Sequence, residues 1–148
     1  MVHYFSYGSN LDQARLQRRC PGAFLVSVGS LPDYRLAFTI HSEGWNAGAA
    51  DVVATAGDRA WGLVFRLSED DLHALDRYEG YPEHYTRFLA SIETPAGIVD
   101  AWAYTASQKQ EFVRPRRRYT DLIREAALHH GFPEGYVRML DRIPVVEE

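Results

Sequence analysis

Apolar and turn-forming residues alternate in short blocks through the first two-thirds of the chain. Runs rich in β-branched and aromatic side chains are bounded by Gly, Pro, Asn or Asp, a pattern typical of strands joined by short connections. Gly29, Pro32 and Gly57 predict breaks between strands, and residues 95–97 predict the turn of a hairpin. About six or seven strands are therefore expected. The runs that predict them are 2–7, 24–28, 34–40, 50–55, 61–67, 85–94 and 99–106.

Capping residues and apolar residues at helical spacing predict helices near the start, the middle and the end of the chain. Residues 12–19 follow a capping Asp or Asn and stop at a Pro-Gly pair. Ser68 begins a second helix with acidic residues in its first turn, and Gly80 ends it. Apolar residues at helical spacing over 119–130 predict a long amphipathic helix, and a short final helix is expected before Pro144.

These elements together predict an α+β protein. Strands that follow one another through short turns favour an antiparallel or mixed sheet closed into a barrel over alternating βαβ units. The length of 148 residues suits one domain. We expect residues 1–144 to form that domain and residues 145–148 to be a frayed tail.

The composition narrows the class of protein. An apolar content of 46% and an aromatic content of 13% exclude disorder, and a single cysteine, Cys20, excludes a disulfide framework. No apolar run approaches the length of a membrane span, and the N-terminus lacks the pattern of a signal peptide. We therefore expect a soluble, cytoplasmic protein that has no membrane partner. The net charge of −4 gives no general attraction for nucleic acid.

The first candidate site is the segment Tyr7-Gly8-Ser9-Asn10-Leu11, where a predicted strand meets a predicted helix. Glycine lets the backbone turn and lets a ligand come close. The amides of Ser9, Asn10 and Leu11 are then expected to point outward as a nest for a carboxylate or an oxyanion. An ordinary strand turn with a Ser or Asn cap remains the alternative, and the sequence has no nucleotide phosphate loop pattern.

Glu79 is the second candidate, because its carboxylate stands between Tyr78 and Tyr81 where a helix opens onto a loop. Partial desolvation in such a place raises the pKa of a carboxyl toward the range that is useful for proton transfer. A solvated Glu near a helix end is the alternative. Asp76, three residues earlier, is expected to share the same face, with Arg77 as the residue that neutralises it.

For most of the other reactive or charged residues, the sequence pattern favours a structural role. Residues 114–118 hold four arginines, which suit phosphate or RNA, but in an acidic chain a solvated face at a helix start is the stronger interpretation. Tyr119 begins the apolar face of that helix, so its hydroxyl is expected to reach an interior pocket. The histidines and Cys20 lack the spacing of metal ligands, so no metal site is expected.

In this order, the segments resemble the gamma-glutamylcyclotransferase family over roughly residues 2–143. The segment Tyr7-Gly8-Ser9-Asn10-Leu11 resembles the family's N-terminal substrate loop. The segment Leu75-Asp76-x-x-Glu79-Gly80 resembles the one that bears its catalytic glutamate. Tyr104 and Tyr119 fall where the family has tyrosines. The resemblance implies a small mixed, mostly antiparallel β-barrel with flanking helices.

The resemblance also implies a reaction. The α-amine of a γ-glutamyl group attacks its own γ-carbonyl, which releases 5-oxoproline and an amino acid or amine. Glu79 is then expected to be the general acid and base, and the substrate, a small γ-glutamyl molecule, is expected to bind to Tyr7, to residues 8–11 and to Tyr119. No cofactor is implied. A non-catalytic protein that binds a γ-glutamyl-like ligand on the same fold remains the alternative.

Two segments leave the identity of the departing amine or amino acid undetermined. Asn46-Ala47 stands where the cyclotransferases of the glutathione pathway tend to have His-Gly. Residues 81–85, Tyr-Pro-Glu-His-Tyr, look closer to the gamma-glutamylamine cyclotransferase branch, whose N-terminal loop is usually Tyr-Gly-Thr-Leu. The resemblance therefore implies the acid–base glutamate but not the identity of the departing amine or amino acid.

Overall fold

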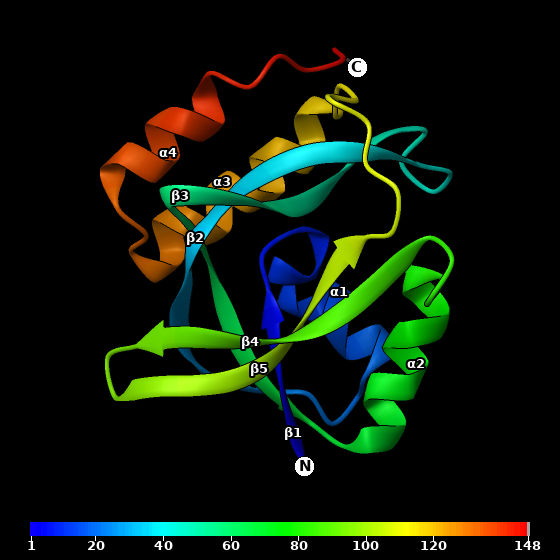
Figure 1. Ribbon diagram of the computed structural model, residues 1–148, viewed down its shortest axis with the longest axis vertical. Helices are drawn as coiled ribbons and strands as arrows, with labels where there is room; N and C mark the ends of the chain where they lie inside the picture. The colour runs from blue at the N-terminus through cyan, green and yellow to red at the C-terminus, as the bar shows by residue number, and fades with distance from the viewer. Residues whose placement is uncertain (148) are drawn as a thin grey trace.

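In the computed structural model, which describes residues 1–147, five strands close into a barrel in the order β1-β3-β2-β4-β5 (Figure 1). All neighbouring strands in this order are antiparallel, and the barrel closes through a parallel contact between β1 and β5 at Tyr4 and Trp102. The predicted small mixed, mostly antiparallel barrel is therefore confirmed. The strands are β1 (Val2–Ser6), β2 (Phe24–Ser42), β3 (Ala47–Leu67), β4 (Tyr85–Thr94) and β5 (Gly97–Ala106).

Two of the strands are much longer than predicted. β2 and β3 form one hairpin of 19 and 21 residues, so the predicted breaks at Gly29, Pro32 and Gly57 are wrong. Bulges in β2, one of them between Pro32 and Tyr34, absorb the irregular residues without ending the ladder. Asp33 takes a positive φ of 64° there, and its carboxylate accepts the Gly57 amide at 3.0 Å. The turn-forming residues therefore bend the hairpin around the barrel instead of dividing it.

Four α-helices in the same described residues confirm the predicted helical segments. Asp12 caps α1 by accepting the amides of Ala14 and Arg15, and Ser68 caps α2 by accepting the amide of Asp71. α2 stands on one side of the barrel, and α3 and α4 pack together on the other (Figure 1). None of the helices within residues 1–147 is long and apolar enough to cross a membrane. Their bounds are α1 (Gln13–Arg19), α2 (Glu69–Glu79), α3 (Arg117–His130) and α4 (Glu134–Asp141).

The segment after α4 is held against the start of α3. Val146 forms a parallel bridge with Arg116, and its amide donates to the Pro115 carbonyl at 2.8 Å. The Glu147 carboxylate accepts from the Arg117 guanidinium at 2.8 Å. The expected frayed tail is therefore wrong for residues 145–147, and residue 148 lies outside the described residues.

Candidate active site

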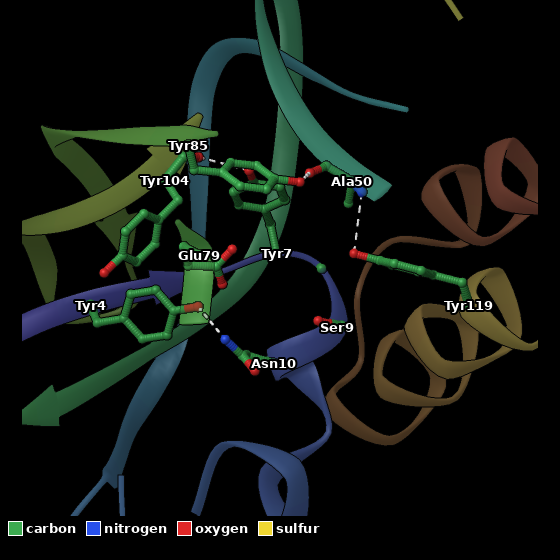
Figure 2. Close-up of a pocket in the computed structure, with 10 residues that line it drawn as sticks. Tyr4, Tyr7, Ser9, Asn10, Ala50, Glu79, Tyr85, Tyr104 and Tyr119 are labelled. Atoms are coloured by element: carbon green, nitrogen blue, oxygen red, sulfur yellow. Dashed lines mark hydrogen bonds between the residues drawn. The ribbon is translucent and has the colours of Figure 1, made fainter. Parts of the chain in front are cut away.

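A pocket opens where the barrel meets the helices, and half of the residues that line it are tyrosines (Figure 2). Its empty volume is about 330 Å³, and part of that space is open to solvent. The polar wall and the small volume suit a compact polar ligand. The residues that line it are Tyr4, Tyr7, Gly8, Ser9, Asn10, Ala50, Glu79, Tyr85, Tyr104 and Tyr119.

The turn after β1 forms one side of the pocket. A short 3₁₀ turn, η1 (Ser9–Leu11), follows Gly8 directly. A Cβ on Gly8 would lie 3.0 Å from the Ala50 Cβ and 3.1 Å from the Tyr119 hydroxyl oxygen, so glycine is what lets the turn come this close to β3 and α3. The predicted substrate segment is therefore placed at the pocket by close backbone packing.

Leu11 does not take the predicted place. Its amide donates to the Gly8 carbonyl at 3.0 Å, and its side chain is buried in the core instead of lining the pocket. The prediction of an outward Leu11 amide is wrong, because the 3₁₀ turn uses that amide for its own hydrogen bond. The predicted residues Tyr7, Gly8, Ser9 and Asn10 do line the pocket.

Glu79 is the last residue of α2, and Gly80 ends the helix behind it with a left-handed φ of 66°. This cap aims the Glu79 carboxyl oxygens into the centre of the pocket, between Tyr4, Tyr7 and the Ser9–Asn10 turn (Figure 2). Burial raises the pKa of Glu79 to about 7, and Asp76 adds to the rise, while the charges of Arg19 and Arg15 oppose it. Glu79 can therefore both accept and donate a proton near neutral pH.

Three of the tyrosine hydroxyls donate to the protein itself. Tyr7 donates to the Tyr104 carbonyl at 2.7 Å, Tyr85 donates to the Ala50 carbonyl at 2.8 Å, and Tyr104 donates to the Asp76 carboxylate at 2.7 Å. Burial raises the pKa of all three well above that of a solvated tyrosine, so they stay protonated. These side chains build a rigid wall around Glu79.

Two other tyrosines present their hydroxyls differently. Tyr119 accepts the Ala50 amide at 3.2 Å, and Tyr4 accepts the Asn10 side-chain amide at 3.1 Å (Figure 2). Burial raises the pKa of both, so each hydroxyl keeps its proton and can donate it to a ligand. The expected interior hydroxyl of Tyr119 is therefore present, and Tyr4 provides a second one.

Asp76 lies behind the pocket wall, and its partner is not the predicted Arg77. Its carboxylate accepts from Arg87 of β4 at 2.9 and 3.2 Å, and from the Tyr104 hydroxyl. Arg77 is exposed on α2. Neighbours in the sequence point to different faces of a helix, whereas the barrel brings β4 and β5 against the inner face of α2.

Asp51 is a structural residue that the sequence pattern missed. Although fully buried, its carboxylate accepts from the hydroxyls of Thr39 and Thr105 at 2.6 and 2.9 Å, and from Lys109 at 2.7 Å. It also accepts the Ala106 amide at 3.0 Å. The network ties β2, β3 and β5 together next to Ala50, which holds two of the pocket tyrosines. Only a knowledge of strand register could have brought these separated residues together.

The arginines of residues 114–118 contact the chain itself. Arg116 donates to the carbonyls of Trp45 and Asn46 at 3.0 and 3.3 Å, and Arg114 donates to the Val145 carbonyl at 3.3 Å. They therefore hold the loop before β3 and the C-terminal segment against α3. Within residues 1–147, no group of three or more His, Cys, Asp or Glu side chains could hold a metal ion.

Known proteins match most of this chain. The AIG2-like family matches residues 59–140, more than half of the sequence. A gamma-glutamylcyclotransferase from Bos taurus is 32% identical over 145 residues, which cover 95% of this chain and 77% of that protein. This chain belongs to the gamma-glutamylcyclotransferase family. The resemblance of its sequence segments is thereby confirmed.

Further relatives agree with this assignment to the gamma-glutamylcyclotransferase family. The human gamma-glutamylcyclotransferase is 30% identical over 146 residues, with 95% of this chain and 77% of that protein covered. A solved structure named gamma-glutamyl cyclotransferase superposes with a TM-score of 0.90 at 28% identity, and covers 98% of this chain and 89% of that one. The barrel and its flanking helices are thus the fold of this family.

Proposed function

We propose that this protein is a γ-glutamylcyclotransferase in which Glu79 carries the protons. The observation that carries the proposal is the Glu79 carboxyl, which sits at the centre of a tyrosine-lined pocket with a pKa raised to about 7. Membership of the family supplies the reaction class. No hydrogen bond from residues 1–147 holds this carboxyl, so it is open to a ligand.

The reaction needs a shuttle of two protons. Ionised Glu79 takes a proton from the α-ammonium of the γ-glutamyl group, and the neutral amine attacks the γ-carbonyl carbon. The new C–N bond closes a five-membered ring, and the nitrogen in that bond gives up a second proton. Glu79 passes the first proton to the departing nitrogen before it accepts the second, because one carboxylate holds one proton at a time. The old C–N bond then breaks, and Glu79 gives the second proton to the departing amine. The protons balance, and Glu79 ends as it began. A positioned acid–base group of this kind contributes about 10²–10⁴-fold to the rate.

Neutral donors surround the place where negative charge develops. The hydroxyls of Tyr4 and Tyr119 keep their protons at neutral pH, and the Ser9–Asn10 turn borders the same space. We assign these groups to the substrate carboxylate and to the oxyanion on the former carbonyl, which preorganised donors stabilise. The rigid wall keeps the γ-glutamyl group folded, and this orientation lowers the barrier by several kcal/mol.

Release of 5-oxoproline tests the proposal. The protein is incubated separately with γ-glutamyl-alanine, γ-glutamyl-ε-lysine and glutathione, and Glu79→Gln serves as the blank. Glu83→Gln is the matched control, because Glu83 is exposed on the following loop and lies outside the pocket. Turnover of at least one substrate by the wild type and by Glu83→Gln, but not by Glu79→Gln, is the expected result. Binding of all three substrates without turnover would replace the proposal with a non-catalytic binding protein.

A further inference from the structure

One arginine that lies outside the pocket attaches the end of α2 to the barrel. Arg87 of β4 lines neither the pocket around Glu79 nor the wider space next to it. Its guanidinium donates to the Asp76 carboxylate at 2.9 and 3.2 Å, through two nitrogens and to both carboxylate oxygens. Such a two-pronged contact fixes the direction of a side chain as well as its position. Arg87 therefore orients the turn of α2 that precedes Glu79.

The same guanidinium also contacts the chain beyond Glu79. It lies 5.0 Å from the centre of the Tyr81 ring and 4.5 Å from the centre of the Trp102 ring. A guanidinium over an aromatic face is attracted to it, so both rings help to hold Arg87 in place. Asp76 comes three residues before Glu79, and Tyr81 comes two residues after it. Arg87 therefore holds the chain on both sides of Glu79.

Asp76 links Arg87 to the wall of the pocket. Its carboxylate also accepts the Tyr104 hydroxyl at 2.7 Å, and the Tyr104 carbonyl accepts the Tyr7 hydroxyl at 2.7 Å. Tyr104 and Tyr7 both line the pocket around Glu79 (Figure 2). A buried polar network whose members all have partners is rigid. The hydrogen bonds that start at Arg87 therefore fix two of the side chains beside Glu79.

The ion pair also contributes to the charge that Glu79 faces. Burial is the main cause that raises the pKa of Glu79, and the Asp76 charge, one helical turn away, adds to the rise. The Arg87 guanidinium lies against that charge and reduces the negative field around it. The side chains of Arg87 and Asp76 are only 13% and 12% exposed, so water screens them weakly. Removing one member or the other therefore changes the net charge near Glu79 in opposite directions.

Other charged groups face Glu79 from the elements packed around it. Arg19 and Arg15 of α1 lower its pKa, and the tyrosines that line the pocket stay protonated and add no charge. Asp51 of β3 is paired with Lys109 at 2.7 Å. All of these groups stay in place when the ion pair behind the pocket is changed. The wider space next to the pocket is also lined by Glu43, Arg77 and His84.

We propose that Arg87 is a positioning residue for the reaction, which acts through Asp76 on the turn and on the charge next to Glu79. This inference rests on the proposed function. Arg87 lies outside the pocket, so its effect on the reaction comes from holding the Asp76 carboxylate. That carboxylate in turn holds Tyr104 and stands one helical turn before Glu79. Loss of Arg87 is therefore expected to lower kcat and to change the pH at which Glu79 ionises.

Two single variants test the inference, because they are expected to shift the pH profile in opposite directions. Asp76→Asn removes a negative charge but keeps an oxygen that can accept the Tyr104 hydroxyl. The acidic limb of kcat/KM is expected to move to lower pH by about 0.5–1 pH unit. Arg87→Gln leaves the Asp76 charge without its cation, so the limb is expected to move to higher pH by a similar amount. Rates of 5-oxoproline release between pH 5 and 9 measure both shifts, with a substrate that the wild type turns over.

Further variants separate the charge from the geometry. Arg87→Lys keeps the charge without the planar fork, so its limb is expected to lie near that of the wild type while kcat falls. The double variant of Asp76→Asn and Arg87→Gln is expected to have a limb between those of the two single variants. Arg124→Gln and Asp141→Asn are the matched controls. They break a 2.8 Å ion pair between α3 and α4, outside both spaces, and neither is expected to move the limb.

A readout without substrate follows the same ionisation. The ¹³C chemical shift of the Glu79 carboxyl carbon, identified by its loss in Glu79→Gln, is titrated in the wild type and in each variant. The expected shifts are those of the rate profile. A merely structural ion pair would lower kcat in both single variants without moving the two titrations in opposite directions.

The outcomes distinguish this inference from the proposed function. Limbs that stay in place, or that move the same way in Asp76→Asn and Arg87→Gln, overturn the inference and leave the cyclotransferase intact. If Arg87→Gln does not fold, Asp76→Asn decides, because a limb that does not move to lower pH overturns the inference. If the wild type releases no 5-oxoproline from any γ-glutamyl substrate, the proposed function fails. The carboxyl titration then still decides whether the ion pair acts on Glu79.

Discussion

The pKa of Glu79 is set by residues that surround it in space more than by its neighbours in the sequence. The Tyr78 side chain beside it in the chain is 60% exposed, whereas the tyrosines that desolvate its carboxyl come from β1, β4, β5 and α3. Removal from water raises the pKa of a carboxyl, and the cations at Arg15 and Arg19 limit that rise. The result is a group poised near neutral pH, which is where a single residue can serve as both base and acid.

The pH dependence of the rate follows from this pKa. Glu79 must be ionised to take the first proton, so kcat/KM is expected to rise with pH and to level off above about 7. Replacing Arg19 by Gln removes a cation that lowers the pKa of Glu79. The acidic limb of the pH profile is therefore expected to move to higher pH in that variant. Initial rates of 5-oxoproline release between pH 5 and 9 measure the profile of the wild type and its shift in Arg19→Gln. A limb that stays in place in Arg19→Gln would contradict the electrostatic account.

The same pKa also predicts a dependence of stability on pH. The Glu79 pKa is about 7 when folded and near 4.5 when unfolded, so the folded state holds the extra proton between these values. Stability from this group is complete below pH 4.5 and declines as the pH rises to about 7. Glu79→Gln cannot ionise, so it is expected to gain on the order of 2 kcal/mol over the wild type at pH 8 and little at pH 4.5. Urea unfolding at both pH values measures this difference.

Among the elements, the end of α2 sets the position of the Glu79 carboxyl. Gly80 turns the chain with a left-handed φ of 66°, and a Cβ there would lie 2.9 Å from the Cβ of His84. Gly131 ends α3 in the same way, with a φ of 72° and no atom within 4 Å of an added Cβ. The two caps carry similar backbone strain for any other residue, but only the first adjoins the site.

These two glycines form a matched pair of tests. Gly80→Ala and Gly131→Ala are each expected to lower the free energy of unfolding by about 1 kcal/mol, because alanine is strained at a positive φ. Gly80→Ala is also expected to reduce kcat, since the crowded His84 displaces the end of α2 that carries Glu79. Gly131→Ala is expected to keep full activity. Equal kcat values in the two variants would show that the cap does not position the carboxyl.

The prediction of elements succeeded where local chemistry decides the structure. Ser68, Asp12 and the glycine after Glu79 cap helices as their residue types suggest, and the hairpin turn at 95–97 lies between β4 and β5. It failed along β2 and β3, because Gly29, Pro32 and Gly57 look the same in a turn as in a bulged strand. Tertiary pairing along a long hairpin overrides local turn propensity there.

At the scale of the whole molecule, the buried Asp51 carboxylate joins three strands behind the pocket. Asp51→Ala would leave the Thr39 hydroxyl and the Ala106 amide without this acceptor, and the Thr105 hydroxyl would keep only the Val52 carbonyl at 3.3 Å. We expect a loss of about 2–4 kcal/mol in unfolding free energy, together with a lower kcat, because neighbouring Ala50 holds Tyr85 and Tyr119.

The exposed Asp100 provides the control for this prediction. Its carboxylate accepts only from the exposed Ser91 hydroxyl, at 3.4 Å, among residues 1–147. Asp100→Ala is therefore expected to change the stability by less than about 0.5 kcal/mol and to leave kcat unchanged. Thermal and urea unfolding of both variants make the comparison. A similar stability for the two variants would show that the Asp51 network does not hold the barrel.

The site as a whole was only partly predictable from the sequence. The place of Glu79, Tyr119 and residues 7–10 at one pocket could be predicted, because motif, cap and apolar face mark them locally. Tyr4, Tyr85 and the Asp51 network could not, because their role depends on strand register and barrel closure.

The most direct test of the account is the rate of 5-oxoproline release from γ-glutamyl-alanine by Glu79→Gln and by the wild type, at saturating substrate and pH 8. The substituted amide has nearly the same shape but cannot carry a proton. A fall in kcat of about 10²–10⁴-fold, with the fold and substrate binding retained, is the predicted result. A kcat within a few-fold of the wild type would contradict the central claim that Glu79 moves the protons.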